Sequence, residues 1–324
     1  MKVTIIGAGA IGGFLGARLA IAGKCHVSAL ARGDTLTALQ TCGWRLIEND
    51  QLIQAEAHAT DRPEDLGPQD LIVIAVKGGS LPAVAASIKP LLKPDTIVLP
   101  AMNGVPWWFC RDVPGFAGVS LRSVDPDAML DNLIPFLNVL GCVVHVTAAT
   151  SEPGLVRHKM GSGLIIGEPD GSVSGRVSQV AGLLGSAGFD VTASDKIRQD
   201  IWYKLWGNAT LNPVSALTGA TVDAVMGDDL VRTFCSAMME EVKSVGAHID
   251  CPIRQTPEDR YAVTARLGAF KTSMLQDAEA GRPLELDALV GAIREIGQRL
   301  GVATPNIDAI LGLTRLYART HGLA

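Results

Sequence analysis

The chain has 324 residues, of which 48% are hydrophobic and 19% charged, and its formal net charge is −5 at pH 7. A chain of this length and composition can bury a large core and is long enough for two domains. The net negative charge argues against a surface for nucleic acid or another polyanion. No run of about 18 apolar residues is present, so no membrane span is expected.

The six cysteines are scattered and form no C-x-x-C pair, and no histidine is spaced to complete a zinc site with them. We therefore expect reduced thiols and no bound metal. The apolar N-terminus is interrupted by glycines and by Arg18, which does not fit a signal peptide. Together these features favour a soluble enzyme of the cytoplasm.

A short strand followed by a glycine-rich turn opens the chain. Residues 2–6 (KVTII) form the strand, and residues 10–22 are expected to continue as an apolar helix that ends at Gly23. The turn between them has the G-x-G-x-x-G spacing of a dinucleotide-binding site and consists of Gly7, Ala8, Gly9, Ala10, Ile11 and Gly12. In such a turn the first glycine permits tight reversal, the second admits a pyrophosphate, and the third lets the helix pack closely on its strand.

The second predicted strand covers residues 25–31, and Arg32 follows it directly. A site that prefers NAD places Asp or Glu near this point, to bond the ribose hydroxyls. An arginine can instead pair with the 2′-phosphate of NADP in a bidentate manner. The sequence therefore favours NADPH/NADP as the cofactor.

Further strands follow the alternating pattern of a doubly wound sheet. Residues 44–57 are expected to form a small hairpin. The next apolar strands cover residues 70–76 and 96–101, with a helix over residues 81–92 between them. Lys77 and Asn103 follow these two strands as Arg32 follows the second one. All three side chains therefore fall at carboxyl ends of parallel strands, where ligands bind in open α/β sheets.

The remainder of the chain changes class near Ser194. Before it we expect a mixed insertion over residues 106–140, and then strand, helix and strand segments over residues 141–148, 155–158, 164–167, 173–187 and 190–193. After it only helices are expected, over residues 196–212, 220–246, 256–279, 285–300 and 305–321. The fold class is thus α/β, with an N-terminal Rossmann-like doubly wound domain over residues 1–194 and an all-α C-terminal domain over residues 195–324.

A polar stripe marks the first helix of the C-terminal domain. Lys204, Asn208 and Asn212 are spaced i, i+4 and i+8, so they share one face of a helix that is otherwise apolar. Pro213 is expected to end or kink this helix. Asparagine forms helices less well than Glu, Lys or Gln, so its use here favours a binding site over a merely solvated face.

Together the motifs resemble the ketopantoate reductase (2-dehydropantoate 2-reductase) family over nearly the whole chain. They are the glycine turn, Arg32, Val76-Lys77, Asn103-Gly104, residues 204–213, and Ser273-Met274-Leu275-Gln276-Asp277 followed by Glu285. The resemblance implies NADPH-dependent reduction of a 2-oxo acid, 2-dehydropantoate, to pantoate in pantothenate biosynthesis. It also implies that the helical domain is of the 6-phosphogluconate dehydrogenase C-terminal-like type.

The resemblance implies a role for each site residue. Lys204 is the general acid, and Glu285 and Asn103 complete the catalytic set. The residues implied to bind the cofactor are Gly7, Ala8, Gly9, Ala10, Ile11, Gly12, Arg32, Lys77, Asn103 and Glu285. Those implied to bind the substrate are Lys77, Asn103, Asn208, Asn212 and Ser273.

Two departures from the family pattern leave the exact substrate open. The best-described members carry an asparagine three residues before the serine, where this chain has Phe270, and another substrate-loop asparagine falls near Val222. Loss of two amide donors is compatible with a larger or more apolar 2-oxo acid. The partner is expected to be a small molecule, and whether the chain forms a homodimer stays open.

Three alternatives remain. A related hydroxy-acid or opine-type dehydrogenase would share the fold, and a non-catalytic NADPH sensor would need only the first domain's motifs. A histidine general acid is the third, with His158 as its candidate, although we expect that residue to lie on a surface strand beside Arg157 and Lys159. The sensor would not require Lys204 together with Asn208 and Asn212.

Overall fold

The structure is a computed structural model that describes residues 1–265 and 268–324. It divides into two compact units, a sheet unit of Met1–Met102 and Met129–Ile197 and a helical unit of Asn103–Ala128 and Arg198–Ala324. The second boundary lies three residues from the one expected at residue 194. The segment Asn103–Ala128 differs from expectation, because the sequence predicts it in the nucleotide-binding domain and it belongs to the helical unit.

Hydrogen bonds explain where that segment belongs. The N–H of Val105 donates to the carbonyl of Ala288 at 2.9 Å. The backbone N–H groups of Arg122 and Ser123 donate to the carboxylate of Glu295 at 2.9 and 2.8 Å. Burial raises the pKa of Glu295, but its bonds to Ser123 and Arg122 outweigh this and leave the pKa lowered. The segment is therefore hydrogen-bonded to the helical unit at two points. Sequence periodicity does not indicate these long-range contacts.

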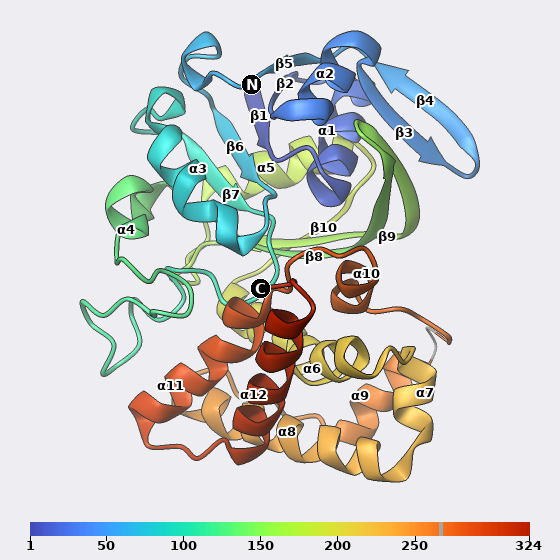
Figure 1. The fold of residues 1–324 in the computed structure, drawn as a ribbon. Coiled ribbons are helices and arrows are strands. Elements are labelled where there is room, and N and C mark those ends of the chain that lie inside the picture. Colours follow the sequence, from blue (N-terminus) through green and yellow to red (C-terminus); the bar gives the residue numbers. More distant parts are fainter. Residues whose placement is uncertain (266–267) are drawn as a thin grey trace. The chain divides into compact units, whose positions relative to one another are not determined.

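The first sheet of the sheet unit is wholly parallel. Its strands are β1 (Lys2–Ile6), β2 (His26–Leu30), β5 (His58–Thr60), β6 (Leu71–Ile74) and β7 (Ile97–Pro100), in the order β5-β2-β1-β6-β7 (Figure 1). The chain runs outward from β1 to one side and then returns to build the other side. The expected doubly wound sheet is thus confirmed, and its topological switch point lies between β1 and β6.

Five α-helices belong to the described part of this unit. They are α1 (Ala10–Ala22), α2 (Gly33–Cys42), α3 (Leu81–Ser87), α4 (Leu130–Leu133) and α5 (Gly175–Ser186). We did not expect α2, which starts directly after Arg32. The helix expected over residues 81–92 gives way to a 3₁₀ turn over Lys89–Leu91, because Pro90 cannot donate an α-helical hydrogen bond.

A second, mixed sheet packs on the other side of α1. Its strands are β3 (Trp44–Glu48), β4 (Gln51–Ala55), β8 (Gly141–Glu152), β9 (Leu155–Gly167) and β10 (Asp190–Ala193), in the order β10-β9-β3-β4 with β8 paired to β9. The β3–β4 hairpin is confirmed. The two short strands expected around residues 161–163 are instead one strand. Gly161, at a φ of 78°, lies where the pairing of β9 with β8 shifts register before it resumes at Gly163.

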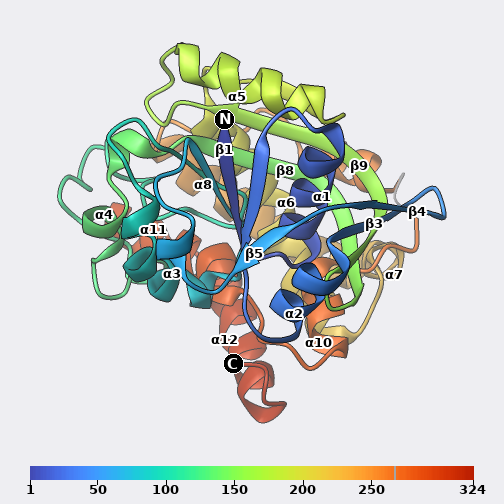
Figure 2. The ribbon, with the colours of Figure 1, turned by 90° about the horizontal axis from the view of Figure 1, so that it is seen from above.

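Glycines let α1 lie closely against this second sheet. A Cβ at Gly13 would be 2.6 Å from Val156 Cγ2, and one at Gly16 would be 2.3 Å from the ring of Trp44. Figure 2 shows α5 along the outer face of β9, with α1 on its inner side. The helix that follows the glycine turn is therefore held between two sheets. Because the turn is continuous with this helix, its position is fixed as well.

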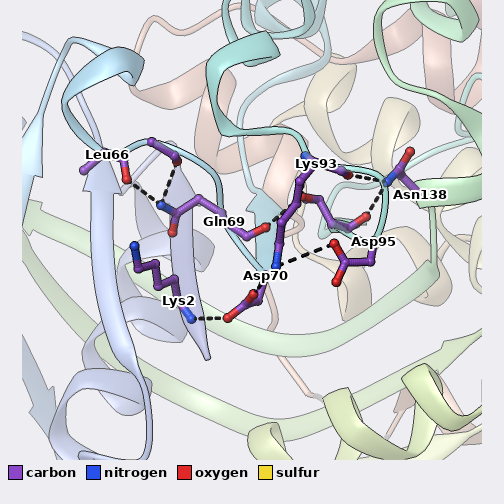
Figure 3. Close-up of polar contacts among 9 residues, drawn as sticks. Lys2, Leu66, Gln69, Asp70, Lys93, Asp95 and Asn138 are labelled. Atoms are coloured by element: carbon purple, nitrogen blue, oxygen red, sulfur yellow. Dashed lines mark hydrogen bonds and ion pairs between the residues drawn. The ribbon is translucent and has the colours of Figure 1, made fainter.

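A polar network closes the amino edge of the parallel sheet (Figure 3). Asp70 accepts from the Lys2 backbone N–H at 2.7 Å and from Lys93 Nζ at 2.6 Å. The hydrogen bond from Lys93 is the main reason that the pKa of Asp70 lies below its usual value. Asn138 Nδ2 donates to the carbonyl of Thr96 at 2.6 Å. The opposite, carboxyl edge carries the glycine turn, Arg32 and Lys77.

The helical unit is built around α8. Its elements are α6 (Ile197–Thr218), α7 (Val222–Gly227), α8 (Asp229–His248), α9 (Pro257–Thr264), α10 (Ser273–Glu279), a π-helical segment (Asp287–Gly291), α11 (Ala292–Leu300) and α12 (Pro305–Thr320) (Figure 1). Asp228 caps α8 and splits the single helix expected over residues 220–246. The helix expected over residues 256–279 divides into α9 and α10, and its residues 266–267 lie outside the described part. No described helix is long and apolar enough to cross a membrane.

Candidate functional site

Two glycines of the turn after β1 are required by packing. Gly7 has a φ of 87°, and a Cβ there would be 2.6 Å from Val76 Cγ1. A Cβ at Gly12 would be 2.0 Å from the carbonyl oxygen of Gly7 and 3.0 Å from Ala75 Cβ. These contacts bring the start of α1 against the end of β6 at the switch point.

Gly9 needs a different explanation. Its φ of −78° suits any residue, and a Cβ there would meet no atom within 4 Å. It is exposed at the N-cap of α1, so it leaves open space beside the free N–H groups of that helix. Such a cradle fits the pyrophosphate of a dinucleotide. Ala8 beside it is buried, whereas Ala10 and Ile11 are half-buried.

A paired substitution separates these two roles. Gly12→Ala drives a Cβ into a backbone oxygen that cannot move cheaply, so we expect a loss of about 1–3 kcal/mol in unfolding free energy together with weakened cofactor binding. Gly9→Ala should leave the unfolding free energy unchanged and weaken the cofactor alone. Denaturant unfolding and cofactor titration measure the two effects. A Gly12→Ala protein with wild-type stability and affinity would contradict the packing argument.

Arg32 lies at the N-terminus of α2. It is exposed and extended (φ −136°, ψ 162°) at the N-cap, and its carbonyl accepts from the N–H of Leu36 at 3.4 Å. Arg32 therefore lies at the positive end of a ten-residue helix and adds a cationic side chain there. Both features favour an anion, which matches the adenosine 2′-phosphate of NADP.

Lys77 is exposed three residues after β6, at the start of a 3₁₀ turn over Gly78–Ser80. Its carbonyl accepts from the N–H of Ser80 at 2.9 Å. The sheet unit thus brings Arg32, Lys77 and the glycine turn to the carboxyl edge of one parallel sheet, as the sequence predicts.

Two tryptophans fix the rotation of α6 in the helical unit. Trp202 Nε1 donates to the carbonyl of Val242 at 3.2 Å, and Trp206 Nε1 donates to that of Met239 at 3.0 Å. Both tryptophans are fully buried against α8. Because they are spaced i, i+4, they define one face of α6, and Lys204 points from the opposite side.

Lys204 is half-buried and bonded to Asn103. Its Nζ donates to Asn103 Oδ1 at 2.8 Å. With the amide oxygen directed at the ammonium, the amide NH₂ of Asn103 is turned away from the lysine. The structure therefore pairs two residues that are 101 positions apart in the sequence.

The Asn103-Gly104 corner is held by the π-helical segment. Gly104 has a φ of 90°, and a Cβ there would be 2.7 Å from the carbonyl oxygen of Ala288. The adjacent Val105 N–H donates to the same carbonyl. This backbone contact fixes the direction of Asn103, and the Asn-Gly pair is its only trace in the sequence.

The asparagines of the stripe differ in exposure. Asn208 is half-buried, and Asn212 is only 6% exposed. Of the two effects expected of Pro213, an end or a kink, the end does not occur, since α6 continues through it to Thr218. The surrounding buried residues maintain the helix where the proline removes one hydrogen bond.

Ser273 and Glu285 stand at element ends. Ser273 is the exposed first residue of α10, and the preceding Thr272 caps that helix by accepting from Leu275 N–H at 3.1 Å. Glu285 is half-buried two residues before the π-helical segment, so it does not start a helix as expected. Both belong to the helical unit, with Lys204, Asn103 and the two asparagines.

His158 contacts other residues of the sheet unit and does not belong to the group around Lys204. Its Nδ1 lies 3.0 Å from Glu48 Oε1, its Nε2 lies 2.7 Å from the carbonyl of Gly161, and its ring stacks on Phe14. His158 lies on a strand, β9, as expected, but its side chain is only 16% exposed. Both ring nitrogens therefore face oxygen atoms of the sheet unit, which does not favour His158 as a general acid.

Two family models match the chain. The model described as Ketopantoate reductase PanE/ApbA matches residues 3–107, and Ketopantoate reductase PanE/ApbA C terminal matches residues 196–318. A curated 2-dehydropantoate 2-reductase of Mesorhizobium japonicum is 43% identical over 323 residues, which is 99% of each chain.

Solved structures are similar over the full length. A provisionally assigned ketopantoate reductase from Ralstonia solanacearum MolK2 has a TM-score of 0.96 at 53% identity and covers 100% of this chain and 99% of its own. The ternary structure of a D-mandelate dehydrogenase has a TM-score of 0.85 at 21% identity, with 100% of both chains covered. The second likeness shows a shared fold.

Proposed function

The chain belongs to the ketopantoate reductase family, and from this premise we propose that it reduces 2-dehydropantoate to pantoate with NADPH, as a step of pantothenate biosynthesis. The observation that carries the proposal is the 2.8 Å bond from Lys204 to Asn103, on a helix that also presents Asn208. A cation fixed by a neutral amide beside further amide donors suits a carbonyl compound that becomes an alkoxide.

Lys204 is the proposed general acid. Addition of a hydride to C2 builds negative charge on the carbonyl oxygen, and an ammonium within hydrogen-bond reach stabilises and protonates it. The Lys204 ammonium donates one hydrogen bond to Asn103 Oδ1, which holds Nζ in position to act on the substrate. After the proton transfer the neutral amine can still donate to Asn103, so the lysine keeps its position for the next turnover.

The other residues position the reactants. Asn208, Asn212 and Ser273 are proposed to donate hydrogen bonds to the substrate and hold C2 in register. Glu285 is proposed to orient Lys204 or a substrate hydroxyl. The residues that would hold the NADPH are the glycine turn, Lys77 and Arg32, and the nicotinamide supplies the hydride when it is bound.

The direct test is a coupled product analysis. Purified protein is incubated with 2-dehydropantoate and limiting NADPH, and both NADPH consumption and pantoate formation are followed. We expect one pantoate for each NADPH oxidised. NADPH oxidation without pantoate would contradict the proposed reaction.

One contact favours a second candidate, reduction of a more apolar 2-oxo acid. The N–H of Val222 donates to the carbonyl of Phe270 at 2.9 Å, so the two positions that depart from the family asparagines are neighbours. Val222 is 3% exposed and Phe270 is half-buried. Two neighbouring positions therefore carry side chains without donors, which would favour an apolar group of the substrate over a hydroxyl.

Phe270→Asn tests this candidate. Restoring one amide should raise the ratio of kcat/KM for 2-dehydropantoate over that for 3-methyl-2-oxobutanoate by about 2- to 10-fold, the worth of one hydrogen bond. Phe270→Leu is the matched control, because it shortens the side chain without adding a donor. An unchanged ratio in the asparagine variant would remove Phe270 from substrate selection.

A further inference from the structure

One face of α6 is only partly covered by the rest of the helical unit. Tyr203, Lys204 and Asn208 are half-buried, whereas most of the remaining residues between positions 201 and 216 are buried. Gly207 lies among these three by helical spacing, one turn after Tyr203 and one residue before Asn208. It is nevertheless buried.

Gly207 is buried because the guanidinium of Arg260, on α9, packs over it. A Cβ at Gly207 would be 2.6 Å from Arg260 Nη2, 2.8 Å from Nε and 3.1 Å from Cζ. The same guanidinium lies 5.1 Å from the centre of the Tyr203 ring. Glycine is a poor residue for a helix interior. Its presence here is explained by the room that it gives to the guanidinium of Arg260.

Nothing in the described part of the chain neutralises this arginine. No carboxylate of the described residues forms an ion pair with Arg260, and its buried Nε has no hydrogen-bond partner among them. Lys204 stands three positions before Gly207, which places a second cation on the same face. The Arg260 guanidinium over Gly207 and Lys204 on the same face of α6 add to one positive potential, which favours the binding of an anion.

We propose that Arg260 binds the carboxylate of the 2-oxo acid substrate. This inference rests on the proposed function, in which the substrate carries a carboxylate at C1 and a carbonyl at C2. Lys204 is proposed to protonate the C2 oxygen, so it does not pair with the C1 carboxylate. Ser273 can donate a hydrogen bond to that carboxylate but carries no charge. A second cation would balance the charge of the carboxylate. A guanidinium matches a carboxylate with two parallel N–H bonds.

Arg260→Gln tests the proposal through the charge of the substrate. The substrates compared are 2-dehydropantoate and 2-dehydropantolactone, its neutral internal ester. In the variant we expect KM for the acid to rise about 10- to 100-fold with a much smaller change in kcat, because a charge-assisted bond is lost. The kcat/KM for the lactone and the affinity for NADPH should stay at wild-type values. Arg254→Gln is the matched control, since it removes an exposed arginine just before α9.

Gly207→Ala provides a second variant that retains the arginine. The added Cβ displaces the end of a flexible side chain and improves helix propensity. We expect an unchanged or higher melting temperature together with a raised KM for the acid. This combination separates a binding role from a structural one.

Two outcomes would overturn the proposal. The first is an Arg260→Gln enzyme that keeps the wild-type preference for acid over lactone, or loses both substrates equally. The second is a loss of NADPH affinity with the acid preference intact, which would assign the arginine to a cofactor phosphate. If the wild-type enzyme reduced no 2-oxo acid, the proposed function would fail separately. Calorimetric binding of pantoate to wild-type and variant proteins would still test Arg260.

Discussion

Lys204→Ala is expected to lower kcat about 10²- to 10⁴-fold, the usual contribution of a positioned general acid. The physical reason is that the ammonium both stabilises and protonates the oxygen on which hydride addition places negative charge. Affinity for NADPH should change little, because the glycine turn and Arg32 belong to the sheet unit. Steady-state kinetics and cofactor titration give the two quantities.

The same helix supplies the comparison for this variant. Asn208→Ala and Asn212→Ala should act mainly through KM for the oxo acid, as contacts do that bind substrate and transition state equally. A Lys204→Ala enzyme that folds, binds NADPH normally and turns over at nearly the wild-type rate would remove Lys204 from the mechanism. The acid would then have to be sought at Lys77 or Glu285.

Arg32→Ala is expected to weaken NADPH binding by about 10- to 150-fold, which corresponds to one charge-assisted pair of roughly 1.5 to 3 kcal/mol. NADH lacks the 2′-phosphate, so its affinity should fall much less. Titration calorimetry with both cofactors measures the difference. The N-terminus of α2 remains in the variant, so some affinity for the phosphate should persist.

Lys24→Ala is the control for this experiment. It removes an exposed cation before the other end of the same strand, β2, and should leave both affinities unchanged. Equal losses of NADPH and NADH in Arg32→Ala would mean that the arginine does not distinguish the two cofactors.

The parallel sheet was predictable because its signals are local. The strand that precedes Gly7 and the apolar strand that precedes Lys77 are each visible within ten residues of sequence. Alternation of strand and helix then fixes a doubly wound order. The polar stripe of α6 was visible for the same reason, since residues four apart share a helix face.

The remainder depends on contacts between distant residues. Pairing of β3 with β9 joins residues 45–47 to residues 155–157, and no local pattern indicates it. The bond between Asn103 and Lys204 requires a segment after the parallel sheet to join the helical unit. Arg260 was missed because an arginine in a helix is ordinary in sequence, and only the structure places it over Gly207.

The decisive measurement is the rate of NADPH oxidation by the wild-type protein with a panel of 2-oxo acids that includes 2-dehydropantoate. We expect turnover with 2-oxo acids that depends on Lys204, with 2-dehydropantoate or a more apolar acid as the best substrate. Tight binding of NADPH without turnover of any member of the panel would contradict it and would favour a protein that only senses the cofactor.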